Sequence, residues 1–349
     1  MALVVADHCW IPGFDGGYFG VDVFFVLSGF LISRLLLDEY DARGQIGLLQ
    51  FYVRRLLRLT PPLLLLLAVY LVVAPLIWPE YGLSSHIRDA ALAGLYLSDY
   101  GRAFWSVPTA LQHTWSLSVE EHFYLFWPFV VVLLVRLQPR WRIAGLLGIY
   151  LLATAWRMFE YQELGWVATY FRADTRMGGL VCGALLALCL ARFTGRIPER
   201  AANVVGVLAC GALVACLSLG FWRSPSSMIW IASLAQWAAV GLLISASVQD
   251  SWISTALSAT PLVRLGIISY GMYLWHYPAA VFVRDLLPWY QTLAIVAGFA
   301  TAMATASYLL LERPLQRYRR NLVFRGKMGA AHEQNRRPLL ARENSVAAM

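Results

Sequence analysis

A histidine and a group of arginines near the N-terminus are the first residues that could carry chemistry. His8 lies in the apolar run LVVADHCW, and a buried imidazole can accept a proton from a hydroxyl group near neutral pH. A helix would gather Arg54, Arg55 and Arg58 on one broad face, and guanidinium groups bind phosphate through paired hydrogen bonds. The pattern indicates a base at one side of a site and an anion-binding group at the other.

Both groups also have a simpler interpretation. His8 could be an interfacial histidine at a helix end. The arginines could anchor the chain to lipid head groups, because basic residues gather in the cytoplasmic loops of membrane proteins. A guanidinium cluster at the mouth of a membrane bundle is nevertheless costly unless an anion uses it, and both interpretations remain open at this point.

Two adjacent carboxylates stand near the start of the segment HTWSLSVEEHFYLFWP. Helical spacing places Glu120 on one face with Ser116 and Tyr124, and it places Glu121 on another. Carboxylates at the start of a membrane span are costly unless they pair or face a polar cavity. We therefore expect Glu120 or Glu121 in the site, and the sequence does not choose between them.

A second polar motif, YFRADTRMGG, precedes a helix of small residues. It contributes Tyr170, Asp174 and Arg176 to the candidates. The simplest role for Asp174 is a local ion pair with Arg172 or Arg176.

A third motif, SYGMYLWHYP, places Ser269, Tyr273 and His276 at positions i, i+4 and i+7. This spacing puts the three side chains on one helix face that points into a bundle. Packing and hydrogen bonding to another helix is the simplest role for His276.

Membrane helices must position these motifs. The 349 residues are 59% hydrophobic and 14% charged, and a soluble protein of this size could not hide so much apolar surface. Apolar runs of about 20 residues predict an all-α, polytopic transmembrane helix bundle of about ten spans. The predicted spans are a partial first helix at 1–10, and then 18–37, 63–78, 117–135, 143–158, 177–191, 204–221, 228–248, 265–283 and 293–311.

The basic residues predict how the bundle is oriented. Of the 28 Lys and Arg residues, 27 are Arg, and 21 of the 28 lie in the tail and in loops on one side of the predicted membrane. The positive-inside rule then places both termini in the cytoplasm. The segment 79–114 would begin and end outside, with the short apolar piece 90–97 lying at the interface or re-entering it.

Two expectations concern the ends of the chain. The first apolar run has ten residues where a span needs about 20, so we expect residues ahead of Met1 in the native protein. We expect residues 1–314 to form one membrane domain and residues 315–349 to form a basic, disordered cytoplasmic tail.

The motifs carry a resemblance to a known family. The stretches GGYFGVDVFFVLSGFLIS, FYVRRLLRLTP, HTWSLSVEEHFYLFWP and SYGMYLWHYP, in this order, resemble the membrane acyltransferase-3 family of bacterial multi-pass enzymes. The resemblance reaches to about Pro314. It implies an inner-membrane O-acyltransferase that moves an acyl group, expected to be acetyl, from acyl-CoA to a hydroxyl group of a glycan, a lipid-linked sugar or a secondary metabolite. Without the hydrolase-like domain that many members append, it would act alone or pass the group to a partner.

The resemblance also implies roles for individual residues. His8 is the expected general base, Asp22 is a candidate to orient or charge-stabilise it, and the arginine cluster would bind the phosphates of acyl-CoA. The expected catalytic residues are His8, Asp22, Glu120, Glu121 and Tyr170. The residues expected to bind substrate are Trp115, Ser116, Asp174, Arg176, Tyr273 and His276.

Other classes of protein fit the sequence less well. A transporter or flippase for a polar lipid is the alternative, but it predicts ion-coupling carboxylates at mid-span, whereas the acidic residues here cluster near span ends. The net charge of +8 does not suggest nucleic acid, because the arginines follow a topology pattern. No P-loop, GxSxG, HExxH or Cys/His metal pattern occurs, so we expect no metal and no permanently bound cofactor. Acyl-CoA would be a cosubstrate.

Overall fold

The computed structural model describes residues 1–193 and 195–315, and every regular element in these ranges is helical. The α-helices are α1 (Ala2–His8), α2 (Gly20–Arg43), α3 (Leu48–Ile77), α4 (Gly82–Gly94), α5 (Ser98–Trp105), α6 (Trp115–Leu134), α7 (Pro139–Phe171), α8 (Ala173–Arg176), α9 (Gly178–Arg192), α10 (Glu199–Leu219), α11 (Ala232–Ala246), α12 (Trp252–Leu257), α13 (Thr260–Val283) and α14 (Trp289–Ser307). Short 3₁₀ turns form η1 (Gly17–Phe19), η2 (Pro79–Tyr81) and η3 (Gln112–Thr114), and π-helical turns form η4 (Ser227–Ile231) and η5 (Tyr308–Glu312).

Many of these helices suit a membrane. Within the described ranges, seven helical segments are long and apolar enough to span one: Gly17–Arg43, Leu48–Ile77, Gln112–Leu134, Pro139–Phe171, Glu199–Leu219, Ser227–Ala246 and Trp289–Leu315. The chain is therefore an all-α, multi-pass membrane bundle, as predicted. The remaining predicted spans correspond to α1, α9 and α13, which do not reach the same length and apolarity, so the count of ten stays a prediction.

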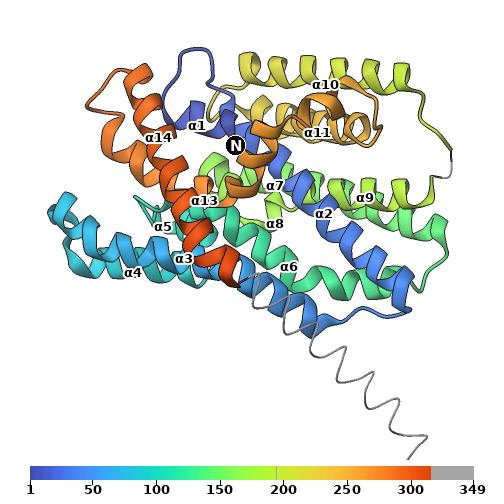
Figure 1. Cartoon of the computed structure of the whole chain (residues 1–349), viewed down its shortest axis with the longest axis horizontal. Helices are drawn as coiled ribbons and strands as arrows, with labels where there is room; N and C mark the ends of the chain where they lie inside the picture. The colour runs from blue at the N-terminus through green and yellow to red at the C-terminus, as the bar shows by residue number, and fades with distance from the viewer. Residues whose placement is uncertain (194, 316–349) are drawn as a thin grey trace, which may run out of the picture.

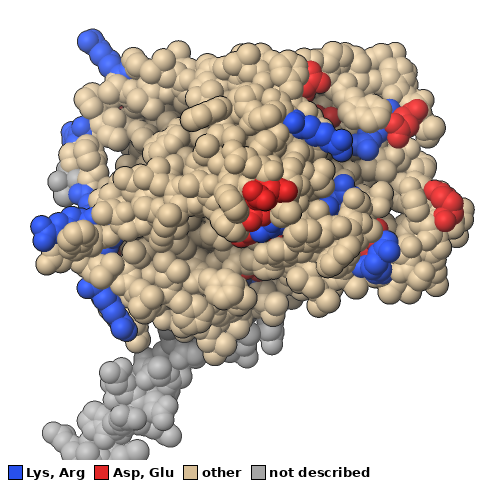
Figure 2. Space-filling model, turned by 180° about the vertical axis from the view of Figure 1, so that it is seen from behind, with Lys and Arg blue, Asp and Glu red and all other residues tan. Residues whose placement is uncertain are grey.

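The surface agrees with this assignment. Uncharged atoms dominate the face in Figure 2, and charged side chains form only small groups on it. Large apolar side chains are exposed along the helices, for example Leu152 at 71% and Leu208 at 67%. Such a surface is costly in water and is favourable against lipid.

The segment between α3 and α6 does not span the membrane. Its helices α4 and α5 have 13 and 8 residues, which is too short to cross. The predicted interfacial piece 90–97 falls at the end of α4 and in the link to α5. Apart from Leu315, the predicted tail at 315–349 lies outside the described residues.

The helices α2 and α9 form the closest packing in the bundle, because glycines remove side chains from their contact. A Cβ on Gly183 would lie 1.9 Å from the carbonyl oxygen of Val26, and one on Gly29 would lie 1.9 Å from that of Leu180. Small residues that let two backbones approach are the usual basis of tight helix packing in membranes.

Two features bring polar groups to the centre of the bundle. Helix α1 packs against α2, α13 and α14 (Figure 1), and His8 at its C-terminal end is partly buried. Helix α7 is broken at Gly165, whose φ of 74° is in the left-handed region that favours glycine. The break redirects the last turn of α7, which carries Trp166 and Tyr170 into the interior.

Candidate active site

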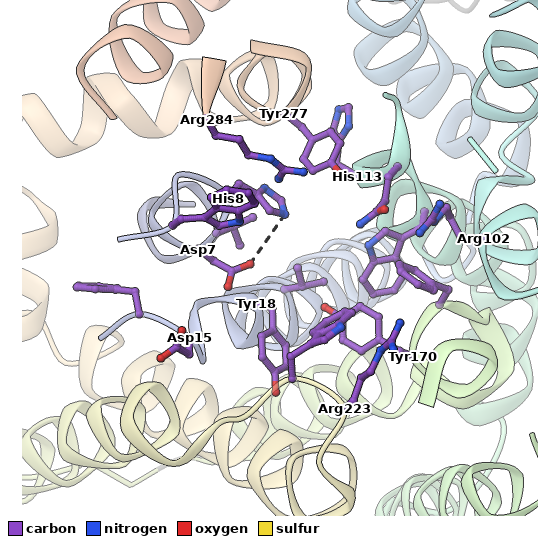
Figure 3. A pocket seen from close by; sticks show the side chains of 18 of the residues that line it. Asp7, His8, Asp15, Tyr18, Arg102, His113, Tyr170, Arg223, Tyr277 and Arg284 are labelled. Carbon is purple, nitrogen blue, oxygen red and sulfur yellow. Dashed lines mark ion pairs between the residues drawn. The ribbon is translucent and has the colours of Figure 1, made fainter. Parts of the chain in front are cut away.

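A cavity of about 710 Å³ lies around the C-terminal end of α1. Figure 3 shows its lining, with His8 and Asp7 on one side and His113, Tyr170 and Arg102 facing them. We call it the His8 cavity. It gathers side chains from α1, η1, α5, η3, α6, α7 and α13, which are far apart in the sequence.

The hydrogen bonds of His276 determine which nitrogen of His8 can act as a base. The carbonyl of Tyr273 can only accept, so Nδ1 of His276 carries a hydrogen and donates it over 2.6 Å. In neutral His276 the lone pair is then on Nε2, which accepts from Nδ1–H of His8 over 2.9 Å. The lone pair of neutral His8 is therefore on Nε2. His276, at 0% exposure, is fully buried and holds the ring of His8 through this hydrogen bond.

A carboxylate stands near that lone pair. An oxygen of Asp7 lies 4.0 Å from Nε2 of His8 (Figure 3, dashed line). This distance is too long for a hydrogen bond, so Asp7 does not orient the ring. Its charge would stabilise an imidazolium formed at Nε2.

Asp22 belongs to a different network from the one expected. It accepts hydrogen bonds from Nη2 of Arg176 over 2.7 Å and from Nε2 of Gln236 over 3.0 Å, and the exposed fractions of Asp22 and Arg176 are 0% and 1%. Among residues 1–193 and 195–315, no hydrogen bond or ion pair joins Asp22 to His8. The prediction that Asp22 orients His8 is therefore corrected, because a buried carboxylate pairs with the buried guanidinium that faces it.

Arg176 supports the cavity wall from outside the cavity. Its guanidinium carbon lies 4.8 Å from the ring centroid of Tyr170 and 5.8 Å from that of Trp115. These two aromatic rings, with centroids 4.9 Å apart, line the His8 cavity together with Trp222. Of the predicted substrate-binding residues, Trp115 thus faces the cavity, whereas Arg176 stands behind it.

Asp174 lies apart from the cavity. It forms an ion pair with Arg172 and accepts a hydrogen bond from Nε1 of Trp156 over 2.8 Å. The structure thus favours the local ion pair over a place in the site.

His113 is a lining residue that the motifs did not single out. Its Nε2–H donates to the carbonyl of Leu274 over 3.1 Å, and its Nδ1 is buried with no hydrogen-bond partner among the described residues. A lone pair is therefore left on Nδ1 of His113. The available signal was its place at the head of the HTWSLSVEEHFY motif.

A second cavity, of about 400 Å³, is lined by two of the arginines that were expected to bind phosphate. We call it the Arg58 cavity. Arg55 and Arg58 line it, and the guanidinium of Arg55 lies 4.4 Å from the ring centroid of Tyr124. Arg54 is not part of it, because it turns away to form a 2.9 Å ion pair with Glu39. The arginine cluster therefore divides into two residues that line the cavity and one that pairs with Glu39.

The structure also separates the two adjacent carboxylates. Glu120 lines the Arg58 cavity and accepts a 2.7 Å hydrogen bond from Tyr124, whereas Glu121 is not among the residues that line either cavity. Ser116, Glu120 and Tyr124 share one lining face, as the helical spacing predicted.

The two cavities share part of their lining. Val4, Val21 and Tyr273 line both of them. The Tyr273 hydroxyl donates to the carbonyl of His113 over 2.7 Å and lies 2.5 Å from the hydroxyl oxygen of Ser116. Tyr273 thus lies between the cavity that Arg55 and Arg58 line and the cavity that His8 lines.

Comparison with known proteins identifies the family. The family model described as "Acyltransferase domain" (Acyl_transf_3) matches residues 1–312. The chain belongs to the acyltransferase-3 family.

Curated relatives are longer than this chain. The peptidoglycan O-acetyltransferase OatA of Listeria monocytogenes is 29% identical over 90% of this chain and 54% of its own length. The O-acetyltransferase OatA of Staphylococcus aureus is 32% identical over 90% of this chain and 55% of its own length. The chain thus spans about half the length of the curated relatives it matches. No solved structure gives a significant match.

The ion pair of Asp22 generates a testable prediction about stability. Asp22→Asn leaves the buried guanidinium of Arg176 without its counter-charge, which costs about 3–5 kcal/mol. Asp38→Asn is the matched control, because Asp38 forms an exposed ion pair with Arg34 that contributes about 1 kcal/mol or less. Thermal unfolding of the purified protein in detergent should show a clearly lower midpoint for Asp22→Asn. Equal midpoints for the two variants would contradict the structural role.

Proposed function

We propose that this protein is a bacterial inner-membrane O-acyltransferase that moves an acetyl group from acetyl-CoA to a hydroxyl group of a glycan, a lipid-linked sugar or a secondary metabolite. The observation that supports it most strongly is that Tyr273 lines both the Arg58 cavity and the His8 cavity. An acyl donor that enters one cavity and an acceptor that enters the other would bring their reacting atoms together at that point.

The Arg58 cavity has the chemistry that a CoA donor requires. Arg55 and Arg58 would bind the phosphates of CoA, since a guanidinium offers paired donors to phosphate oxygens. The apolar lining from Phe24, Leu27 and Leu31 suits the pantetheine arm, which would direct the thioester toward Tyr273.

The His8 cavity would hold the acceptor hydroxyl group. The hydroxyl oxygen attacks the thioester carbonyl carbon while its proton passes to Nε2 of His8, so a C–O bond forms and the C–S bond breaks. The imidazolium is stabilised by the carboxylate of Asp7, 4.0 Å away. The proton then passes to the CoA thiolate, and free CoA and an acetyl ester are the products.

The walls of this cavity support a sugar as the acceptor. Trp115, Tyr170 and Trp222 line it, and aromatic rings offer flat apolar faces that stack on the C–H faces of a sugar ring. The Listeria monocytogenes relative is named a peptidoglycan O-acetyltransferase, which favours the same class of acceptor.

The proposed orientation follows from the arginine-rich loops. With both termini in the cytoplasm, the Arg58 cavity would open toward cytoplasmic acetyl-CoA and the His8 cavity would open to the outside. The acetyl group, rather than the whole CoA molecule, would then cross the constriction at Tyr273.

A transporter of a polar lipid or an acylated precursor is the second candidate, because two cavities that share one wall inside a membrane bundle would also suit passage of a solute. Release of free CoA from acetyl-CoA by the purified protein separates the two functions. A transporter would move its solute without consuming acetyl-CoA.

The role of His8 is tested by His8→Gln. Glutamine can still hydrogen-bond to His276 but cannot take up a proton, so acetyl transfer should fall by about 10²- to 10⁴-fold. His122→Gln is the control, because His122 lies outside both cavities and pairs with Asp99. The rates should be compared at equal amounts of folded protein. Retention of most of the activity by His8→Gln would place the base elsewhere.

The donor site is tested by Arg58→Gln. Loss of a charge-assisted contact to phosphate should raise the KM for acetyl-CoA by about ten- to a hundredfold, with a smaller effect on kcat. Arg54→Gln should leave the KM nearly unchanged, because Arg54 is paired with Glu39 outside the cavity. An equal rise for both variants would indicate a general surface-charge effect.

A further inference from the structure

Three arginines line the His8 cavity, and the proposed transfer does not use them. Arg102 belongs to α5, Arg223 lies in the loop after α10, and Arg284 follows the last residue of α13. Figure 3 shows them on different sides of the pocket. We call these three residues the arginine rim.

The arginine rim has no counter-charges of its own. Within the described part of the chain, none of its guanidinium groups lies within ion-pair distance of a carboxylate, whereas Arg54, Arg172 and Arg176 all do. The cavity contains two carboxylates, those of Asp7 and Asp15, against the three cations.

The positive-inside pattern does not explain the rim arginines as membrane anchors. They are among the seven basic residues on the side opposite the arginine-rich loops, where the positive-inside pattern predicts few cations. Three of these seven nevertheless converge on one cavity.

Aromatic rings hold two of the guanidinium groups in place. Arg284 lies over the ring of Trp10 at 5.0 Å and Arg102 over that of Phe171 at 5.2 Å. A stacked guanidinium keeps its N–H edge available for a planar anion. The Nε atoms of Arg102 and Arg284 are buried and have no hydrogen-bond partner among the described residues, although Nη1 of Arg102 donates to the carbonyl of Ser106. Burial lowers the pKa of the Arg102 guanidinium from its ordinary value.

We infer that the acceptor molecule carries a carboxylate or phosphate group, which the arginine rim binds while the reacting hydroxyl group stands at Nε2 of His8. The inference rests on the proposed function for the reaction and adds the chemical class of the acceptor. The aromatic wall would hold the sugar ring, and the rim would select sugars that bear an anionic substituent.

Two kinds of acceptor would present an anionic group to the arginine rim. The anion could be the carboxylate of an acidic sugar or the phosphate of a sugar joined to a lipid. D-Glucuronate and glucose 1-phosphate are probes for these two cases, and glucose is their neutral counterpart.

The test measures binding rather than turnover, so it does not depend on acetyl transfer. The tryptophans of the cavity, Trp10, Trp115 and Trp222, report on occupancy through their fluorescence in the full protein in detergent. We expect D-glucuronate, glucose 1-phosphate or both to bind at least about tenfold more tightly than glucose. A preference for one anion identifies the source, and equal preference supports recognition of any anion.

Variants locate the binding. Arg284→Gln should reduce the preference to less than about threefold, and Arg223→Gln, an exposed loop substitution that does not threaten folding, should reduce it in the same direction. Arg140→Gln is the matched control, because Arg140 also lies over a tryptophan, Trp141, but outside both cavities. It should keep the full preference.

Three results would overturn the inference. The first is equal or undetectable binding of all three probes, and the second is a full anion preference in both Arg284→Gln and Arg223→Gln. The third is loss of the preference in Arg58→Gln alone, which would place the anion in the donor cavity. Failure of the proposed function has a different signature: the anion preference remains, and acetyl-CoA is not consumed.

Discussion

The buried ion pair between Asp22 and Arg176 is the interaction on which the candidate site depends. Its two charges are almost completely excluded from solvent, and Gln236 completes it from a third helix. Such a pair is costly to bury and still more costly to break, because the remaining charge would be unpaired in a medium of low dielectric constant. It therefore fixes α2, α8 and α11 in one arrangement.

That arrangement determines the wall of the His8 cavity. Arg176 lies against the rings of Tyr170 and Trp115, so the ion pair positions the surface on which we propose that the acceptor stacks. The glycines at the contact of α2 and α9 allow the backbones to come close enough for the pair to form. Side chains that do not touch the reacting atoms thus shape the site.

Helix α13 connects the two cavities. Its successive turns present Ser269 and Tyr273 to the Arg58 cavity, and Tyr273 and Tyr277 to the His8 cavity, while His276 hydrogen-bonds to His8. One helix therefore positions the proposed donor side, Tyr273 and the proposed base relative to one another.

Short-range periodicity predicted the parts of the site that lie on single helices. The face formed by Ser116, Glu120 and Tyr124 follows from helical spacing, and so does the inward face of α13. The contact of His8 with His276 joins residues 268 positions apart. No local pattern predicts such a pairing, because it depends on how α1 packs against α13.

The same limit explains why two expected contacts are not formed. Asp22 and His8 lie toward the same end of neighbouring helices, which predicts that they meet. The orientation of α2 about its own axis instead turns the carboxylate toward Arg176. Arg54 shares a helical face with Arg58 in sequence, yet Glu39 draws it out of the cavity. Rotation of a helix and competition for a counter-charge are tertiary effects.

A structure of the protein with a nontransferable acetyl-CoA analogue, in which a methylene group separates the sulfur from the acetyl carbonyl, is the most direct measurement of the central claim. We predict that the phosphates of the CoA analogue contact Arg55 and Arg58 and that its acetyl group lies beside Tyr273, toward Nε2 of His8. A CoA nucleotide bound in the His8 cavity, or an acetyl group far from Tyr273, would contradict it.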